Sequence, residues 1–181
     1  ACDFRMSGGN GSVMTYLGSG NQGIETMLPA AVAAKHLGVS EEKLLRAELL
    51  GMLIIMYMKR HVGRLSPICG ATLAGSGSAA AITYMMGGNL EQICGAVQNM
   101  MGGVAGIFCD GAKGGCALKL SICAGEAVYA AMYAMDNSII QATDGIISAS
   151  VEETTKNLMK LSHEGLSEVD MKVIEIMQTK K

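Results

Sequence analysis

Two long stretches of this sequence carry no charged side chain, and they restrict what the chain can fold into. Residues 67–88 and 92–109 are each nearly long enough to cross a bilayer. They are built from Gly, Ala, Ser, Thr and Cys rather than from Leu, Ile and Phe, and few basic residues flank them. We therefore expect the buried helices of a globular bundle, and no membrane partner.

The composition indicates an interior built from small and flexible side chains. Half of the 181 residues are hydrophobic and 17% are charged, but only 4% are aromatic; glycine occurs 24 times and methionine 15 times. Ala, Leu, Ile and Met must therefore fill the core, which favours helices packed closely through small residues. The length suits one domain over residues 1–181.

Charge and cysteine content limit the partners and the compartment. The formal net charge is −2 and no basic run occurs. This argues against a nucleic-acid partner, because phosphate binding needs a cationic surface. The six cysteines occur without a signal-peptide pattern. They are typical of free thiols in a reducing compartment and predict a cytoplasmic protein.

Helix start and stop signals divide the chain into segments joined by glycine-rich loops. Proline is tolerated in the first turn of a helix, so Pro29 places the regular start of the first long helix near Leu28. Ser40 and the acidic residues after it cap the second, and the last two helices should form a hairpin that covers the bundle. No alternating strand pattern is present. We expect an all-α, compact bundle of about seven to eight helices, with segments 24–37, 40–61, 71–86, 90–101, 116–135, 151–163 and 167–177.

Two thiols, Cys109 and Cys116, flank a segment with three glycines. A continuous helix would hold them roughly 10.5 Å apart along its axis, but glycines let the segment fold back and bring the sulfurs together. Successive amides in such a turn also form an anion-binding concavity. Cys69 follows a proline at a chain reversal and can point into the same site. Cys94 and Cys123 should instead be buried in helices elsewhere. The pattern predicts a metal–thiolate site beside an anion pocket.

A glycine-rich loop, residues 18–23, leads into the first long helix. Its amides, the Ser19 hydroxyl and the side-chain amides of Asn21 and Gln22 could bind an anion such as a substrate carboxylate. A plain turn with a helix cap is the alternative. Lys119, one turn into the helix after Cys116, is a candidate catalytic residue for proton transfer or for binding substrate charge.

Five motifs occur in order along the chain: DFRM (3–6), GSGNQGI (18–24), RLSPICGA (64–71), CDGAKGGCALK (109–119) and VIEIM (173–177). Together they resemble the L-cysteine desulfidase family, which is related to the alpha domain of iron-sulfur L-serine dehydratases. The resemblance runs from end to end. It implies an oxygen-labile [4Fe-4S] cluster held by Cys69, Cys109 and Cys116, with one iron left open to polarise the substrate.

The resemblance also implies an activity. In this family L-cysteine, or L-serine in the related enzymes, undergoes elimination across Cα and Cβ to give pyruvate, ammonia and hydrogen sulfide or water, without pyridoxal phosphate. Family members carry an N-terminal part with a Gly-Cys-Thr-Glu-Pro motif, which residues 1–181 lack. We expect this chain to be the C-terminal, cluster-binding portion, to have the N-terminal portion as its partner, and to be inactive alone.

Two other functions stay open at this point. A structural zinc module could use the same thiols, although closed zinc sites want four ligands and no CxxC spacing exists. A helical domain whose cysteines only pack is the other alternative. The sequence leaves open the preferred substrate, the general base and whether the chain forms a homo-oligomer.

Overall fold

The structure is a computed structural model that describes residues 1–63 and 65–180. Arg64, the first residue of the 64–71 motif, lies outside the described residues. The described ranges form eight α-helices and isolated bridges but no strand, which confirms the expected all-α bundle. The elements are α1 (Cys2–Met6), α2 (Gly20–Leu37), α3 (Glu41–Val62), α4 (Gly70–Met86), α5 (Leu90–Val104), α6 (Cys116–Met135), α7 (Val151–Lys160), the π-helical turn η1 (Leu161–Gly165) and α8 (Val169–Thr179).

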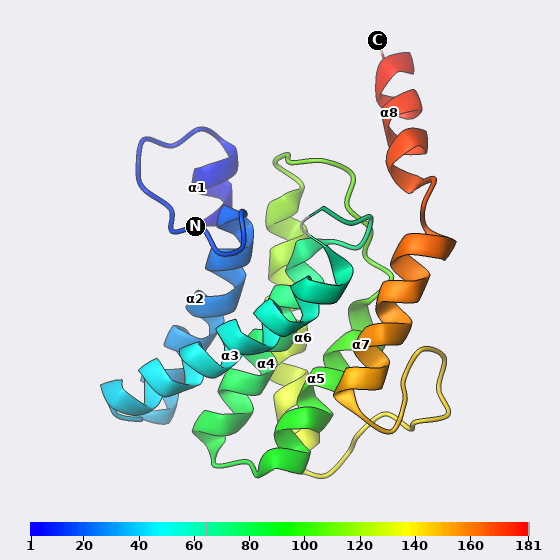
Figure 1. The fold of residues 1–181 in the computed structure, drawn as a ribbon. Coiled ribbons are helices and arrows are strands. Elements are labelled where there is room, and N and C mark those ends of the chain that lie inside the picture. Colours follow the sequence, from blue (N-terminus) through cyan, green and yellow to red (C-terminus); the bar gives the residue numbers. More distant parts are fainter. Residues whose placement is uncertain (64, 181) are drawn as a thin grey trace.

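Helix α4 lies at the centre of the bundle, with α2, α3, α5 and α6 packed around it (Figure 1). Its small side chains permit this position. A Cβ at Gly77 would lie 2.7 Å from the Gly51 carbonyl oxygen of α3, and a Cβ at Gly51 would lie 2.7 Å from the Gly77 oxygen. The two backbones therefore meet where α3 crosses α4, with no room for a side chain. Within residues 1–63 and 65–180, no helix combines the length and the apolar character of a membrane span.

Helix α2 begins earlier than the sequence predicted. It starts at Gly20, where the Ser19 hydroxyl accepts a hydrogen bond from the Gln22 amide, and Pro29 lies inside it. Pro29 has no N–H to give the Glu25 carbonyl four residues before it. The hydroxyl of Ser78, in α4, donates to that carbonyl instead. A contact from a neighbouring helix thus makes the internal proline acceptable.

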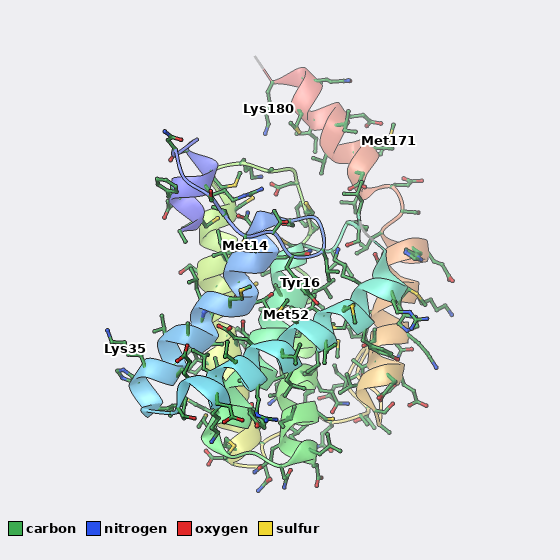
Figure 2. All side chains as sticks on the ribbon, turned by 60° about the vertical axis from the view of Figure 1, so that its left-hand side comes forward. Met14, Tyr16, Lys35, Met52, Met171 and Lys180 are labelled. Atoms are coloured by element: carbon green, nitrogen blue, oxygen red, sulfur yellow. The ribbon has the colours of Figure 1, made fainter. Side chains whose placement is uncertain are left out.

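The N-terminal residues fold against the start of α2. The sequence did not predict α1, a five-residue helix without a side-chain cap. The loop between α1 and α2 is anchored by the Tyr16 hydroxyl, which donates to the Met52 carbonyl of α3 at 2.6 Å (Figure 2). A Cβ at Gly23 would lie 2.2 Å from the Met14 carbonyl oxygen, so this loop lies directly on the first turns of α2.

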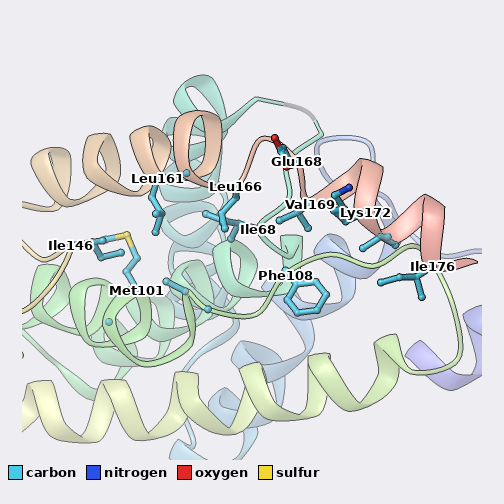
Figure 3. Close-up of a pocket in the computed structure, with 15 residues that line it drawn as sticks. Ile68, Met101, Phe108, Ile146, Leu161, Leu166, Glu168, Val169, Lys172 and Ile176 are labelled. Atoms are coloured by element: carbon cyan, nitrogen blue, oxygen red, sulfur yellow. The ribbon is translucent and has the colours of Figure 1, made fainter.

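The last two helices do not form the expected hairpin. Helix α7 packs on α3 and α5, but no residue of α8 is buried, and α8 projects from the bundle (Figure 1). The π-helical turn η1 takes up Gly165, so the chain is not reversed there. The apolar residues Val169, Val173 and Ile176 face an open groove of about 580 Å³, whose other wall includes Ile68 and Phe108 (Figure 3).

Candidate functional site

Two loops that are distant in the sequence pair through their backbones and carry two of the predicted ligands. Ile68 and Phe108 form an isolated antiparallel bridge. On either side of it, the Cys69 amide donates to the Ile107 carbonyl at 2.8 Å, and the Cys109 amide donates to the Pro67 carbonyl at 2.6 Å. The pairing fixes the loop before α4 against the loop after α5.

Side-chain alternation across this bridge separates the thiols from the apolar groove. Successive residues of extended backbone point to opposite faces, so Cys69 and Cys109 share one face while Ile68 and Phe108 share the other. Ile68 and Phe108 do line the groove beside α8. The two cysteines are diagonal neighbours, for which Cα separations of about 7–8 Å are typical. One backbone pairing therefore directs both thiols to the same side.

Cys116 completes the predicted set at the first residue of α6. The loop before it turns at Gly111, which has a positive φ of 92°, and the Cys116 Sγ lies 3.6 Å from the Gly111 carbonyl oxygen. Burial raises the pKa of the Cys69 thiol; the Ala71 amide and Lys119 oppose this rise, whereas Cys109 and Cys116 add to it. Cys109 and Cys116 therefore both lie within electrostatic reach of Cys69.

Lys119 holds the Cys109 loop against α6. Its ammonium donates to the Phe108 carbonyl at 2.8 Å and pairs with the Asp110 carboxylate, so it grips the residues on both sides of Cys109. Its Nζ also lies 5.4 Å from the centroid of the Phe108 ring. The carboxylate of Asp110 pairs with Lys113 as well. The structure thus places Lys119 in a network that positions the loop.

A second lysine near the thiols was not singled out by sequence reasoning. Lys59 lies in the last turn of α3, where a cation suits the helix C-terminus. Burial lowers its pKa, while the thiols of Cys109 and Cys69 act against that change, which places its ammonium near both. The sequence signal that could have indicated Lys59 as a site residue is its position at the end of an apolar helix, just before the loop that carries Cys69.

The loop predicted to bind substrate lies beside Cys69. Ser19 serves as the cap of α2. Gln22 is 4% exposed and packs on the first turn of α4, since a Cβ at Gly70 would lie 2.3 Å from its Nε2. The Gln22 Oε1 is buried without a hydrogen-bond partner among the described residues. Asn21 turns the other way, toward α1.

Helix α1 brings two further side chains to this place. The Asn21 Oδ1 accepts hydrogen bonds from the Arg5 Nη1 at 3.0 Å and from the Cys2 Sγ at 3.4 Å. Cys2 is buried, and burial followed by the nearby Cys116 raises its pKa. Sequence reasoning missed Arg5 and Cys2 as site residues because nothing local predicted α1.

Glu25, in the second turn of α2, carries a buried carboxyl group. It is 2% exposed, its Oε1 has no partner among the described residues, and burial raises its pKa to about 9. It therefore stays protonated at neutral pH. Burial, with Glu25 and Cys69 as the next causes, raises the pKa of the Cys123 thiol to about 12.

The two cysteines expected to lie elsewhere differ from each other. Cys94 is partly buried in α5, as a packing residue. Cys123 is fully buried in α6, but it belongs to the same core cluster as Cys69 and is nearer to the candidate site than predicted. Its position on the inner face of α6, two turns after Cys116, accounts for this.

The thiol arrangement does not form a site for a single metal ion. In the described part of the chain, no group of three or more His, Cys, Asp or Glu side chains is placed to hold one ion. An ion such as zinc binds each thiolate at about 2.3 Å and needs its sulfurs gathered within about 4 Å of each other. A [4Fe-4S] cluster binds each thiolate to a different iron and accepts wider spacing. Thiolate sulfur is the kind of donor that an iron-sulfur cluster requires.

Comparison with known proteins places the chain in a family. A sequence profile of the serine dehydratase alpha chain matches residues 1–175. The chain is 46% identical to a UPF0597 protein of Desulfatibacillum aliphaticivorans, 43% to one of Bacteroides fragilis and 44% to one of Caldanaerobacter subterraneus. These alignments cover 100%, 99% and 100% of the chain but 42%, 42% and 43% of the relatives. No solved structure matches it. The chain belongs to the serine dehydratase alpha chain family.

Proposed function

We propose that this chain is the cluster-binding portion of an iron-sulfur lyase that eliminates across Cα and Cβ of L-cysteine or L-serine. The products would be pyruvate, ammonia and hydrogen sulfide or water. The observation that supports this most is the backbone pairing of two loops, which directs Cys69 and Cys109 to one side, with Cys116 in electrostatic reach. Membership of the serine dehydratase alpha chain family supports a lyase.

Cys69, Cys109 and Cys116 would hold the [4Fe-4S] cluster. When bound, such a cluster supplies an iron without a cysteine ligand, which can polarise a substrate carboxylate or leaving group. Free thiols and an oxygen-labile cluster belong in a reducing compartment, which for this protein we propose to be the cytoplasm. The donors are all sulfur, as an iron-sulfur site requires.

The residues around the thiols would bind and orient the amino acid. The start of α2 offers amide donors and the positive end of a helix dipole to a carboxylate. For Lys119 we favour positioning of the Cys109 loop over proton transfer. Its ammonium is already engaged by the Phe108 carbonyl and the Asp110 carboxylate, on either side of Cys109.

The remainder of the protein would supply what this chain lacks. The chain spans less than half the length of the relatives it matches. We propose that the other portion, acting as partner, contributes the general base that removes the Cα proton. The chain alone would then bind iron without turning over substrate.

Anaerobic reconstitution with ferrous iron and sulfide tests the cluster. We expect a brown protein with about four irons per chain, as a cysteine-ligated cubane requires. Cys109→Ser should lose most of this iron, while the matched Cys94→Ser, in α5, should keep it. Protein that binds zinc but no iron would favour the zinc module. Unchanged metal binding after all three cysteines are replaced by serine would favour a purely structural domain.

A further inference from the structure

Arg5 lies across the first turn of α2 and is held there by close contacts. Its Nη1 donates to the Asn21 Oδ1 at 3.0 Å and lies 3.1 Å from the Met6 sulfur. A Cβ at Gly20 would lie 2.5 Å from the Arg5 Nε and 3.2 Å from its Cζ. The glycine therefore lets the guanidinium rest directly on the backbone at the start of the helix.

The guanidinium has donors that the described residues do not use. Arginine carries five N–H groups, and its two side-chain hydrogen bonds, to Asn21 and to Met6, both use Nη1. No carboxylate among residues 1–63 and 65–180 forms an ion pair with Arg5. A half-buried arginine whose Nη2 group has no partner among the described residues suits an anion such as a carboxylate.

The backbone beside the Arg5 guanidinium also favours an anion. In the first turn of α2, Ser19 accepts from the Gln22 amide through its hydroxyl and from the Gly23 amide through its carbonyl. The amides of Gly20 and Asn21 have no acceptor among the described residues, and they lie at the positive end of an 18-residue helix.

The same place borders the candidate cluster thiols. The Cys2 Sγ shares the Asn21 Oδ1 with Arg5, and Cys2 is within electrostatic reach of Cys116. Gln22 packs against Gly70, the residue after Cys69. A ligand held by Arg5 would therefore lie between the starts of α2, α4 and α6.

We propose that Arg5 binds the carboxylate of the α-amino acid substrate, with the Gly20 and Asn21 amides as additional donors. This proposal rests on the proposed function, because it names the group that recognises the substrate of that site. It assigns the specificity for a free carboxylate to α1, and it makes Gly20 a requirement for the position of the arginine.

Calorimetric binding to the reconstituted chain tests the proposal. The probes are L-serine and L-serinamide, which differ in the charged carboxylate. Loss of a charge-assisted pair should weaken L-serine binding by roughly 10- to 100-fold in Arg5→Met. Arg5→Lys, which keeps the charge but loses the bidentate geometry, should fall between Arg5→Met and wild type. The matched control is Arg46→Met, which removes an exposed arginine paired with Glu42 on α3.

The amide probe separates carboxylate binding from a structural role. Wild type should prefer L-serine over L-serinamide, and Arg5→Met should lose that preference while its iron content stays at the wild-type level. An Arg5→Met protein that weakens both probes equally would overturn the proposal, and so would a wild type that binds neither probe. Iron content is measured separately, so a failure of the cluster itself is recognised as a failure of the proposed function.

Discussion

The replacement of Glu25 by glutamine should change how stability depends on pH. Glu25 is 2% exposed and its pKa is raised by burial from 4.5 to about 9. The native state therefore keeps a proton that the unfolded chain releases near pH 4.5. Stability from this group is complete below that pH and is lost as the pH rises toward 9. Glutamine has nearly the same shape and does not titrate.

The size of the effect follows from the proton balance. While only the unfolded state is ionised, each pH unit changes the free energy of unfolding by about 1.4 kcal/mol. Between pH 5 and pH 8 the wild type should therefore lose about 4 kcal/mol relative to Glu25→Gln. Local relaxation around the carboxyl group would reduce this value, so it is an upper limit.

Urea unfolding at pH 5, 6, 7 and 8 measures the difference. Only the change in the gap between the two proteins matters, because the intrinsic fit of glutamine and the titration of other groups cancel in it. Glu164→Gln, at an exposed position, is the control and should run parallel to wild type. A gap between wild type and Glu25→Gln that stays constant across the four pH values would refute the reasoning.

Three other changes test the packing and the loop network. Ser78→Ala leaves the Glu25 carbonyl buried without a donor and should lower the free energy of unfolding by about 1–3 kcal/mol in urea titrations. Adding Pro29→Ala, which restores an N–H, should recover part of the loss. A double mutant whose effect is the sum of the two single effects would contradict this. Gly77→Ala forces a Cβ against a backbone oxygen of α3 and should cost about 1–3 kcal/mol, seen as a lowered Tm; an unchanged Tm would show that the helices separate easily. Lys119→Met should release the Cys109 loop and lower the amount of iron that the reconstituted protein retains after gel filtration. Lys113→Met, which removes the more exposed ion pair with Asp110, should retain iron like wild type. Equal iron retention in both variants would remove Lys119 from the positioning role.

The sequence predicted the helices whose signals are local. Ser40 and Ser150 cap α3 and α7 with their hydroxyls, and the glycines after α2 and α4 end those helices in left-handed backbone. The start of α2 could not be predicted, because the hydrogen bond that makes Pro29 acceptable comes from Ser78 in another helix. The direction of α8 could not be predicted either. It is set by the π-helical turn η1, which continues α7 without reversing the chain.

The candidate site was predictable only where its residues carry motifs. Cys109 and Cys116 stand out because glycines separate them, but the pairing that brings Cys69 to Cys109 requires two loops to meet in three dimensions. Arg5 reaches the site through α1, which lacks a side-chain cap. Glu25 has no local signal, because the burial that makes it unusual comes from the helices packed around it.

The backbone pairing of the two thiol loops has a consequence for the order in which the chain folds. The Cys69 amide donates to the Ile107 carbonyl and the Cys109 amide to the Pro67 carbonyl, so the pairing joins segments that have α4 and α5 between them. Closing such a long loop costs chain entropy, and contacts between distant segments offset that cost only once the intervening chain is ordered. We therefore expect the two cysteines to come together after α4 and α5 have packed against each other.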